Sequence, residues 1–194
     1  MSAGGELVGI VLAAGRSTRF GSDKLLHRLP DGTPMALASA TALRAAVPRT
    51  VAVVGAHNEA LAALFAAHGI ETTIAHQADA GMGASLAAGI DATVGARGWV
   101  VALGDMPYIR RDTVARVAGA LGAGARLAAP AYQGRRGHPV GFSAWFRREL
   151  LGLRGDEGAR SILRQHEGEL VLLDCDDPGV VVDVDQPTAL MPPA

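Results

Sequence analysis

The chain has 194 residues, of which 49% are hydrophobic and 19% charged, so a folded domain with a full apolar core is expected. A formal net charge of −1 excludes a broad basic face and argues against a nucleic-acid or membrane-surface partner. The single cysteine, Cys175, excludes an internal disulfide and a multi-cysteine zinc site.

The beginning of the chain, MSAGGEL, lacks the basic segment and apolar core of a secretory signal. No apolar run approaches the roughly 20 residues that span a bilayer. We therefore expect a cytoplasmic protein with a single domain over 1–194 and a core from about residue 7 to residue 190.

Apolar runs alternate with helical patterns rich in alanine and leucine along the first two thirds of the chain. The runs predict strands over 7–13, 50–56, 70–75, 98–104 and 125–131. The patterns between them predict helices over 34–46, 58–69, 83–95 and 112–122. Nearly continuous apolar strands are typical of a parallel sheet that is covered on both faces. The fold class is therefore α/β, a doubly wound, mostly parallel sheet with helices on both faces.

The ends of two helices carry recognisable signals. Thr33 is expected to cap the helix over 34–46, with Pro34 as its first residue. Asn58 is expected to cap the next helix, and Gly69 to stop it.

The alternation loosens after Pro130. The run 138–142 is too short for a central parallel strand and is expected to pair antiparallel at the end of the sheet. Helices are predicted over 143–153 and 157–168, and strands over 169–174 and 179–185. The predicted sheet is therefore mixed.

The stretch LAAGRSTRFGSDK, residues 12–24, follows the first predicted strand. Its small residues let backbone N–H groups approach an anion, and Arg16, Arg19 and Lys24 can neutralise one. Phosphate is the favoured ligand, although the glycine spacing matches neither a P-loop nor the dinucleotide fingerprint. The alternative is a surface loop with solvated arginines.

Acidic residues and a second glycine-rich turn stand at other strand ends. Asp105 follows the strand over 98–104, and Asp183 and Asp185 flank Val184, so both would point to one face of a strand. Carboxylates so placed can hold Mg²⁺ on a polyphosphate, although each could instead cap a turn or helix. The turn AGMGASL leads into a helix through Ser85, and it is either a ligand loop or a plain capped turn.

Taken with AGMGASL, GDMP, GRRGHPVGF and DVDQP, the stretch LAAGRSTRFGSDK resembles the LAAGxSxRxGxxK signature of the MobA-like nucleotidyltransferases. The resemblance runs from about residue 8 to residue 190 and is strongest to the molybdenum cofactor cytidylyltransferase branch. It implies a Rossmann-like nucleotidyltransferase fold and Mg²⁺ as the cofactor.

The resemblance also implies roles for individual residues. The residues implied to bind the nucleotide are Leu12, Ala13, Ala14, Gly15, Arg16, Arg19, Lys24, Gly83, Ala84 and Ser85. Those implied to be catalytic are Lys24, Arg16 and Asp105. The implied metal ligands are Asp105 and Asp185, with Asp183 the weaker candidate for the second position. Those implied to contact the acceptor are Arg135, Arg136, Gly137 and His138.

The implied reaction transfers CMP from CTP to the terminal phosphate of the molybdopterin cofactor and releases pyrophosphate. The implied partners are CTP or another NTP, a molybdopterin-type cofactor, and a recipient molybdoenzyme or its chaperone. The alternatives are a guanylyltransferase, a transferase with another phosphate acceptor, and a nucleotide-binding module without turnover.

Overall fold

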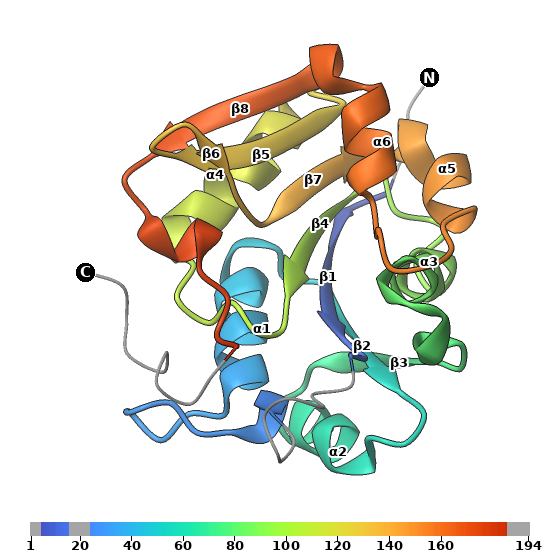
Figure 1. Cartoon of the computed structure of the whole chain (residues 1–194), viewed down its shortest axis with the longest axis vertical. Helices are drawn as coiled ribbons and strands as arrows, with labels where there is room; N and C mark the ends of the chain where they lie inside the picture. The colour runs from blue at the N-terminus through green and yellow to red at the C-terminus, as the bar shows by residue number, and fades with distance from the viewer. Residues whose placement is uncertain (1–4, 16–23, 186–194) are drawn as a thin grey trace.

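A computed structural model describes residues 5–15 and 24–185, which contain an eight-stranded mixed sheet (Figure 1). The strands are β1 (Leu7–Ala13), β2 (Thr50–Gly55), β3 (Glu71–Ala75), β4 (Gly98–Leu103), β5 (Leu127–Tyr132), β6 (Arg135–Arg136), β7 (Val140–Ser143) and β8 (Leu170–Cys175). The strands predicted up to 125–131 and the strand predicted over 169–174 are therefore present, with small shifts at their ends.

The strand order brings β1 and β4 together at the centre of the sheet. It runs β3, β2, β1, β4, β7, β5, and both β6 and β8 pair with β5. The chain passes from β1 outward to β3 and then returns to the other side of β1 as β4, and all of these pairs are parallel. This reversal of direction makes a topological switch point between β1 and β4, and open α/β sheets bind ligands beyond the carboxyl ends of the strands at such a point.

The prediction that 138–142 pairs at the end of the sheet is wrong. The corresponding strand β7 is antiparallel as expected, but it lies inside the sheet between β4 and β5. Its short run can occupy an interior position because Val140 and Phe142 are buried on one face. On the other face Gly141 admits Leu121 and Val117 of a helix, whose atoms lie 3.0 Å from the position of a Cβ.

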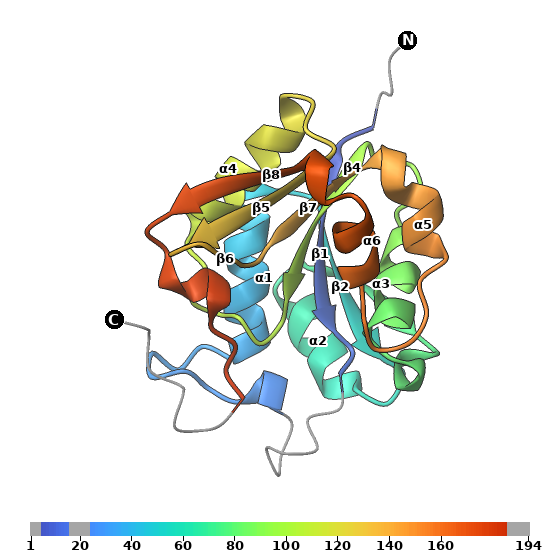
Figure 2. The ribbon, with the colours of Figure 1, turned by 45° about the horizontal axis from the view of Figure 1, so that its top comes forward.

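Helices cover both faces of the sheet, as the doubly wound fold requires (Figure 2). They are α1 (Met35–Ala46), α2 (Glu59–Ala67), α3 (Met82–Asp91), α4 (Arg111–Gly122), α5 (Arg147–Leu151) and α6 (Arg160–Gln165). Side chains of α1, α2 and α4 join one buried cluster, and those of α3, α5 and α6 join another on the opposite face. None of these helices in the described ranges is long and apolar enough to cross a membrane.

The expected helix caps are confirmed in one case and wrong in another. Asn58 caps α2 by accepting a hydrogen bond from the Leu61 N–H at 3.1 Å. Thr33 is not a cap, because α1 begins at Met35 with Pro34 in the cap position and no side-chain cap. The Thr33 backbone instead closes a turn, with its carbonyl accepting from Leu29 and its N–H bonded to a side chain.

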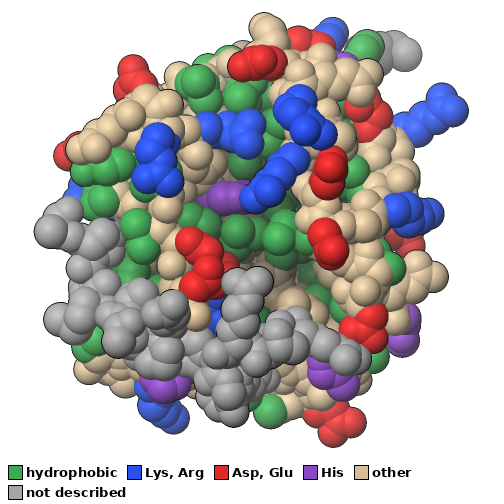
Figure 3. All heavy atoms as spheres, viewed as in Figure 1, with side chains coloured by type: hydrophobic (Ala, Val, Ile, Leu, Met, Phe, Trp, Pro, Cys, Tyr) green, Lys and Arg blue, Asp and Glu red, His purple; other side chains and the backbone are tan. Residues whose placement is uncertain are grey.

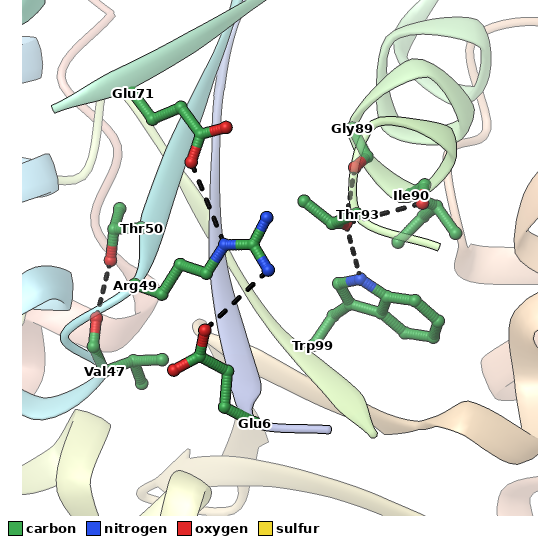
Figure 4. A network of polar contacts seen from close by, with 9 residues as sticks. All are labelled: Glu6, Val47, Arg49, Thr50, Glu71, Gly89, Ile90, Thr93 and Trp99. Carbon is green, nitrogen blue, oxygen red and sulfur yellow. Dashed lines mark hydrogen bonds and ion pairs between the residues drawn. The ribbon is translucent and has the colours of Figure 1, made fainter. Parts of the chain in front are cut away.

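Two polar networks lie near the amino ends of the strands (Figure 4). Arg49, just before β2, lies 3.7 Å from Glu6 and 3.8 Å from Glu71, so it joins the starts of three neighbouring strands. Thr93 donates to the Gly89 carbonyl and accepts from the buried Trp99 indole at 2.8 Å. The first network therefore joins neighbouring strands, and the second ties the end of α3 to β4.

The strand predicted over 179–185 is also wrong. The segment begins as a 3-10 turn, η5 (Pro178–Val181), and continues without a strand partner among the described residues to Asp185. The buried Asp177 carboxylate fixes the turn by accepting from the Gly179 N–H, the Arg110 N–H and the Thr113 hydroxyl. The chain is therefore tied to the loop after β4 rather than to a sheet edge.

Candidate functional site

The carboxyl ends of β1 and β4 form the base of the candidate site. The Gly104 N–H donates to the Leu12 carbonyl at 2.9 Å, which holds the two strand ends side by side. Ala13 and Ala14 are buried in the clusters on opposite faces of the sheet, and Gly15 is exposed. Arg16 and Arg19 lie outside the described residues, so their predicted contact with the triphosphate stays a prediction.

Lys24 stands at the centre of the site. It is the only lysine among the 18 lysine and arginine residues, and it opens a short 3-10 turn, η1 (Lys24–Leu26). Its side chain is 10% exposed, and its Nζ lies 2.9 Å from Asp105 Oδ2 and 2.8 Å from Asp185 Oδ1. The three residues predicted to share a site are therefore in direct contact.

The two carboxylates keep Lys24 charged. Burial is the largest single influence and lowers the pKa of Lys24, because it disfavours the ammonium form. The hydrogen bonds and charges of Asp185 and Asp105 act against burial and together leave the pKa of Lys24 above its ordinary value. A compact ammonium at this position is a strong local cation for carboxylate or phosphate oxygens.

Asp183 completes a group of three carboxylates with Asp105 and Asp185. Each can offer one oxygen, and these oxygens lie within 4.8 Å of one another. The pKa of Asp183 is raised, first by burial and then by the nearby charges of Asp185 and Asp105. Three clustered oxygen donors are the ligand type that Mg²⁺ and Mn²⁺ prefer, so the residues present fit a divalent ion of this kind.

The two aspartates face the site although they are not on a strand. Val184 between them is fully buried with Leu29 and Met35, whereas Asp183 and Asp185 are exposed. The Val184 N–H also donates to the Asp105 carbonyl at 2.9 Å. The alternation in the sequence therefore correctly predicts that both aspartates face the same side, but it wrongly predicts that they lie on a strand.

A cavity of about 300 Å³ opens beside the carboxylates. Its floor is apolar and includes Leu12, Leu86, Val101, Met106, Val140 and Leu163. Its polar lining includes Arg135, Arg136, His138, Arg160 and Asp183. Figure 3 shows a hollow on this face, with a green floor, a purple histidine beside it, blue basic side chains above and red acidic side chains below. The volume is at the lower end of the range of about 300–1,000 Å³ found for small-molecule sites.

His138 contributes a neutral polar group to this lining. Burial lowers its pKa to about 4, against a partly compensating interaction with the Val101 backbone, and the positive charge of Arg136 lowers it further. The imidazole is therefore neutral at pH 7. Among the described residues, its buried Nδ1 has no hydrogen-bond partner.

Gly137 positions the turn that carries His138. Its N–H donates to the Pro130 carbonyl at 2.8 Å, and a Cβ at this glycine would collide with the Val180 backbone. The His138 N–H donates to the Val180 carbonyl, also at 2.8 Å. The hairpin of β5 and β6 is thereby fastened to η5, the turn that leads into the acidic segment.

Residues 83–85 do not line the cavity themselves, although the residues on either side of them do. They form the first turn of α3, which begins at Met82, so Ser85 is inside the helix and is not its cap. The Gly83 N–H donates to the Gly155 carbonyl at 2.8 Å, and Ala84 and Ser85 are buried. Of this helix, Met82 and Leu86 reach the cavity. Contact between residues 83–85 and a base or ribose stays a prediction.

The sequence reading did not identify Arg160 as a site residue. It is the first residue of α6 and lies on the cavity next to the predicted acceptor residues. The local pattern GARSIL indicates a helix and nothing more, since only the packing of α6 on the sheet brings Arg160 to this place.

Residues 9–170 match the family described as "MobA-like NTP transferase domain". The chain belongs to this family. It is 32% identical over 188 residues to nicotine blue oxidoreductase of Paenarthrobacter nicotinovorans, covering 92% of each chain. It is 28% identical over 191 residues to purine catabolism protein PucB of Bacillus subtilis (strain 168), covering 93% of this chain and 92% of that one.

Solved structures have the same fold. The manganese complex of Rv0371c from Mycobacterium tuberculosis H37Rv superimposes with a TM-score of 0.80 and 28% identity, covering 95% of each chain. The doubly wound sheet with its helices on both faces is therefore a nucleotidyltransferase fold, as the sequence resemblance implies.

Proposed function

We propose that this protein transfers CMP from CTP to the terminal phosphate of a molybdopterin-type cofactor and releases pyrophosphate. The observation that carries the proposal is Lys24 between Asp105 and Asp185 at the switch point, beside a cavity with a basic rim. Membership of the NTP transferase family supports the use of a nucleoside triphosphate. The relative named nicotine blue oxidoreductase points to a redox reaction for that protein, whereas the charged groups here suit phosphoryl chemistry.

In the proposed reaction a phosphate oxygen of the acceptor attacks the α-phosphorus of CTP. The bond from the α-phosphorus to the bridging oxygen breaks, and pyrophosphate leaves with the electron pair. The attacking oxygen is already anionic near neutral pH, so no general base is needed. This agrees with a site in which His138 is neutral and the aspartates serve as ligands.

The residues of the chain align the two phosphates and balance their charge. Asp105 and Asp185, with Asp183 as the third donor, would hold Mg²⁺, which supplies charge stabilisation to the reacting phosphates when bound. Lys24 would donate to the phosphates once it is released from the carboxylates, and Arg16 and Arg19 would bind the triphosphate. Residues 12–15 and 83–85 would border the nucleotide, and Arg135 to His138 would border the acceptor.

Pyrophosphate release from the purified protein tests the proposal. Each of the four common ribonucleoside triphosphates is supplied with and without molybdopterin cofactor and Mg²⁺, and release should require CTP, acceptor and metal together. Asp105→Asn should lower release on the order of a thousandfold, and Asp91→Asn, on an exposed aspartate at the end of α3, should leave it intact. Preference for GTP would establish the guanylyl alternative, and nucleotide binding without any release would contradict an enzyme.

A further inference from the structure

Three arginines line the cavity at a distance in sequence from the predicted nucleotide loop. Arg135 and Arg136 form the short strand β6, and Arg160 begins α6. All three side chains are exposed and border the cavity. We call these three residues the arginine arc.

The arginine arc is not neutralised within the described part of the protein. None of the three side chains has an ion pair or a side-chain hydrogen bond to residues 5–15 or 24–185. Neighbouring arginines differ, because Arg154 donates to the Leu153 carbonyl and Arg164 is paired with Glu157 at 3.1 Å. Like charges gathered around one hollow favour an anion between them, although water screens side chains that are exposed.

The imidazole of His138 lines the same cavity as the arginine arc. The charges of Arg136 and Arg160 both act on this ring, and so does the charge of Asp105. His138 therefore lies within reach of two of the arginines and of one carboxylate. Its buried Nδ1, without a partner among the described residues, adds an unused polar group to the same lining.

The cavity lining combines the arginine arc with two carboxylates over an apolar floor. Asp183 belongs to the group of three carboxylates where the proposed metal and the reacting phosphates would lie. The other carboxylate is that of Glu157, which is already paired with Arg164 at 3.1 Å. Leu12, Val101 and Leu163 are among the floor residues. Figure 3 shows blue side chains above the green floor, and red side chains both below it and to its right.

We propose that the arginine arc binds an oxyanion of the acceptor that is separate from its reacting phosphate. The acceptor is then a molecule with a second anionic group apart from its reacting phosphate. Planar guanidinium groups suit such an oxyanion because they donate two parallel hydrogen bonds. That this ligand is the acceptor rests on the proposed function, whereas the oxyanion site itself rests on the arginines and the cavity.

Inorganic phosphate is the probe for the oxyanion site. It is titrated into metal-free protein without nucleotide, and the Cε1–Hε1 NMR signal of His138 is followed, because this ring lines the same cavity as the three arginines. The wild type should give a saturable shift, and Arg136→Gln/Arg160→Gln should weaken binding by at least about tenfold, since charge-assisted bidentate contacts are lost. Arg116→Gln, on an exposed arginine of α4, is the matched control and should behave as the wild type. A missing shift, or equal binding in the double variant, overturns the proposal.

Steady-state kinetics then separates the acceptor from the nucleotide. The double variant should raise the KM for the acceptor by at least about tenfold and leave the KM for CTP within about twofold, because uniform binding is lost for one substrate only. A raised KM for CTP instead would assign the arginine arc to the triphosphate and overturn the proposal. If the wild type shows the phosphate-dependent shift but no CTP turnover, the oxyanion site stands and the proposed function fails.

Discussion

Replacing Lys24 by methionine should tighten the binding of Mn²⁺ to the free protein. Lys24 donates to Asp105 and Asp185 at 2.9 and 2.8 Å, and these carboxylates are the proposed metal ligands. The ammonium and a divalent ion therefore compete for the same oxygens. Methionine keeps an unbranched side chain of nearly the same length, one atom shorter, and removes the competing charge.

The size of the effect follows from the charges at the site. Three carboxylates and one ammonium give a local charge of about −2, which becomes about −3 in the variant. Two unit charges 4 Å apart interact by about 4 kcal/mol at an effective dielectric constant of 20, but water reduces this because the Asp185 side chain is 60% exposed. We expect a net gain of about 1.4 kcal/mol, which is tenfold in affinity.

Electron paramagnetic resonance of free Mn²⁺, measured without nucleotide, provides the binding constant. The same variant should lose turnover with CTP, because Lys24 no longer contacts the phosphates, so binding and activity should change in opposite directions. Since Lys24 is the only lysine, reductive ¹³C-methylation labels this side chain and the terminal amine alone, and Mn²⁺ should shift the lysine signal in the wild type. Unchanged or weaker Mn²⁺ binding in Lys24→Met would refute the competition.

Three further predictions concern the metal ligand, the base and the buried histidine. Asp105→Asn should lower kcat on the order of a thousandfold while the melting temperature changes little, and a folded variant with near-normal kcat would remove Asp105 from the site. For the wild type, kcat/KM with CTP should exceed kcat/KM with GTP by at least about tenfold, because one methyl group in a pocket discriminates by roughly 10–200-fold. Ala14→Gly should narrow this ratio. Equal use of CTP and GTP by the wild type would contradict cytidylyl transfer. The pKa of His138 falls from 6.5 to about 4 on folding, so stability is lost as the pH drops through this window. Urea titrations of the wild type should show that the free energy of unfolding falls by on the order of 3 kcal/mol across this window, and His138→Gln should lack this loss. If the free energy of unfolding depends on pH equally in both proteins, the burial argument is disproved.

Much of the fold could be predicted because its strands are buried on both faces. The run over 7–13 matches β1 residue for residue, since apolar side chains are needed on both sides of a central strand. The place of β7 could not be predicted, because a four-residue strand becomes central only when Gly141 lets α4 pack closely against it. A local sequence pattern predicts that a strand forms, but it does not predict which strands lie beside it.

Part of the candidate site could also be predicted from the sequence, and part could not. Lys24, Asp105 and Asp185 were expected together because each follows or lies near a strand end, and the carboxyl ends of parallel strands meet at one edge. Arg160 was not expected, because it comes from a helix that covers the sheet face and its sequence carries no ligand-like pattern. Its position depends on tertiary packing that no local signal encodes.

The acidic segment shows why a wrong secondary structure can still place side chains correctly. A strand was expected because Asp183, Val184 and Asp185 alternate polar and apolar character. The physical requirement behind that alternation is that one apolar side chain is buried while its two neighbours are not, and any extended backbone meets it. Val184 is buried with Leu29 and Met35, and its N–H is held by the Asp105 carbonyl. The same residue that fixes the segment to the core therefore sets both aspartates beside Asp105, and strand pairing is not needed to assemble the three carboxylates.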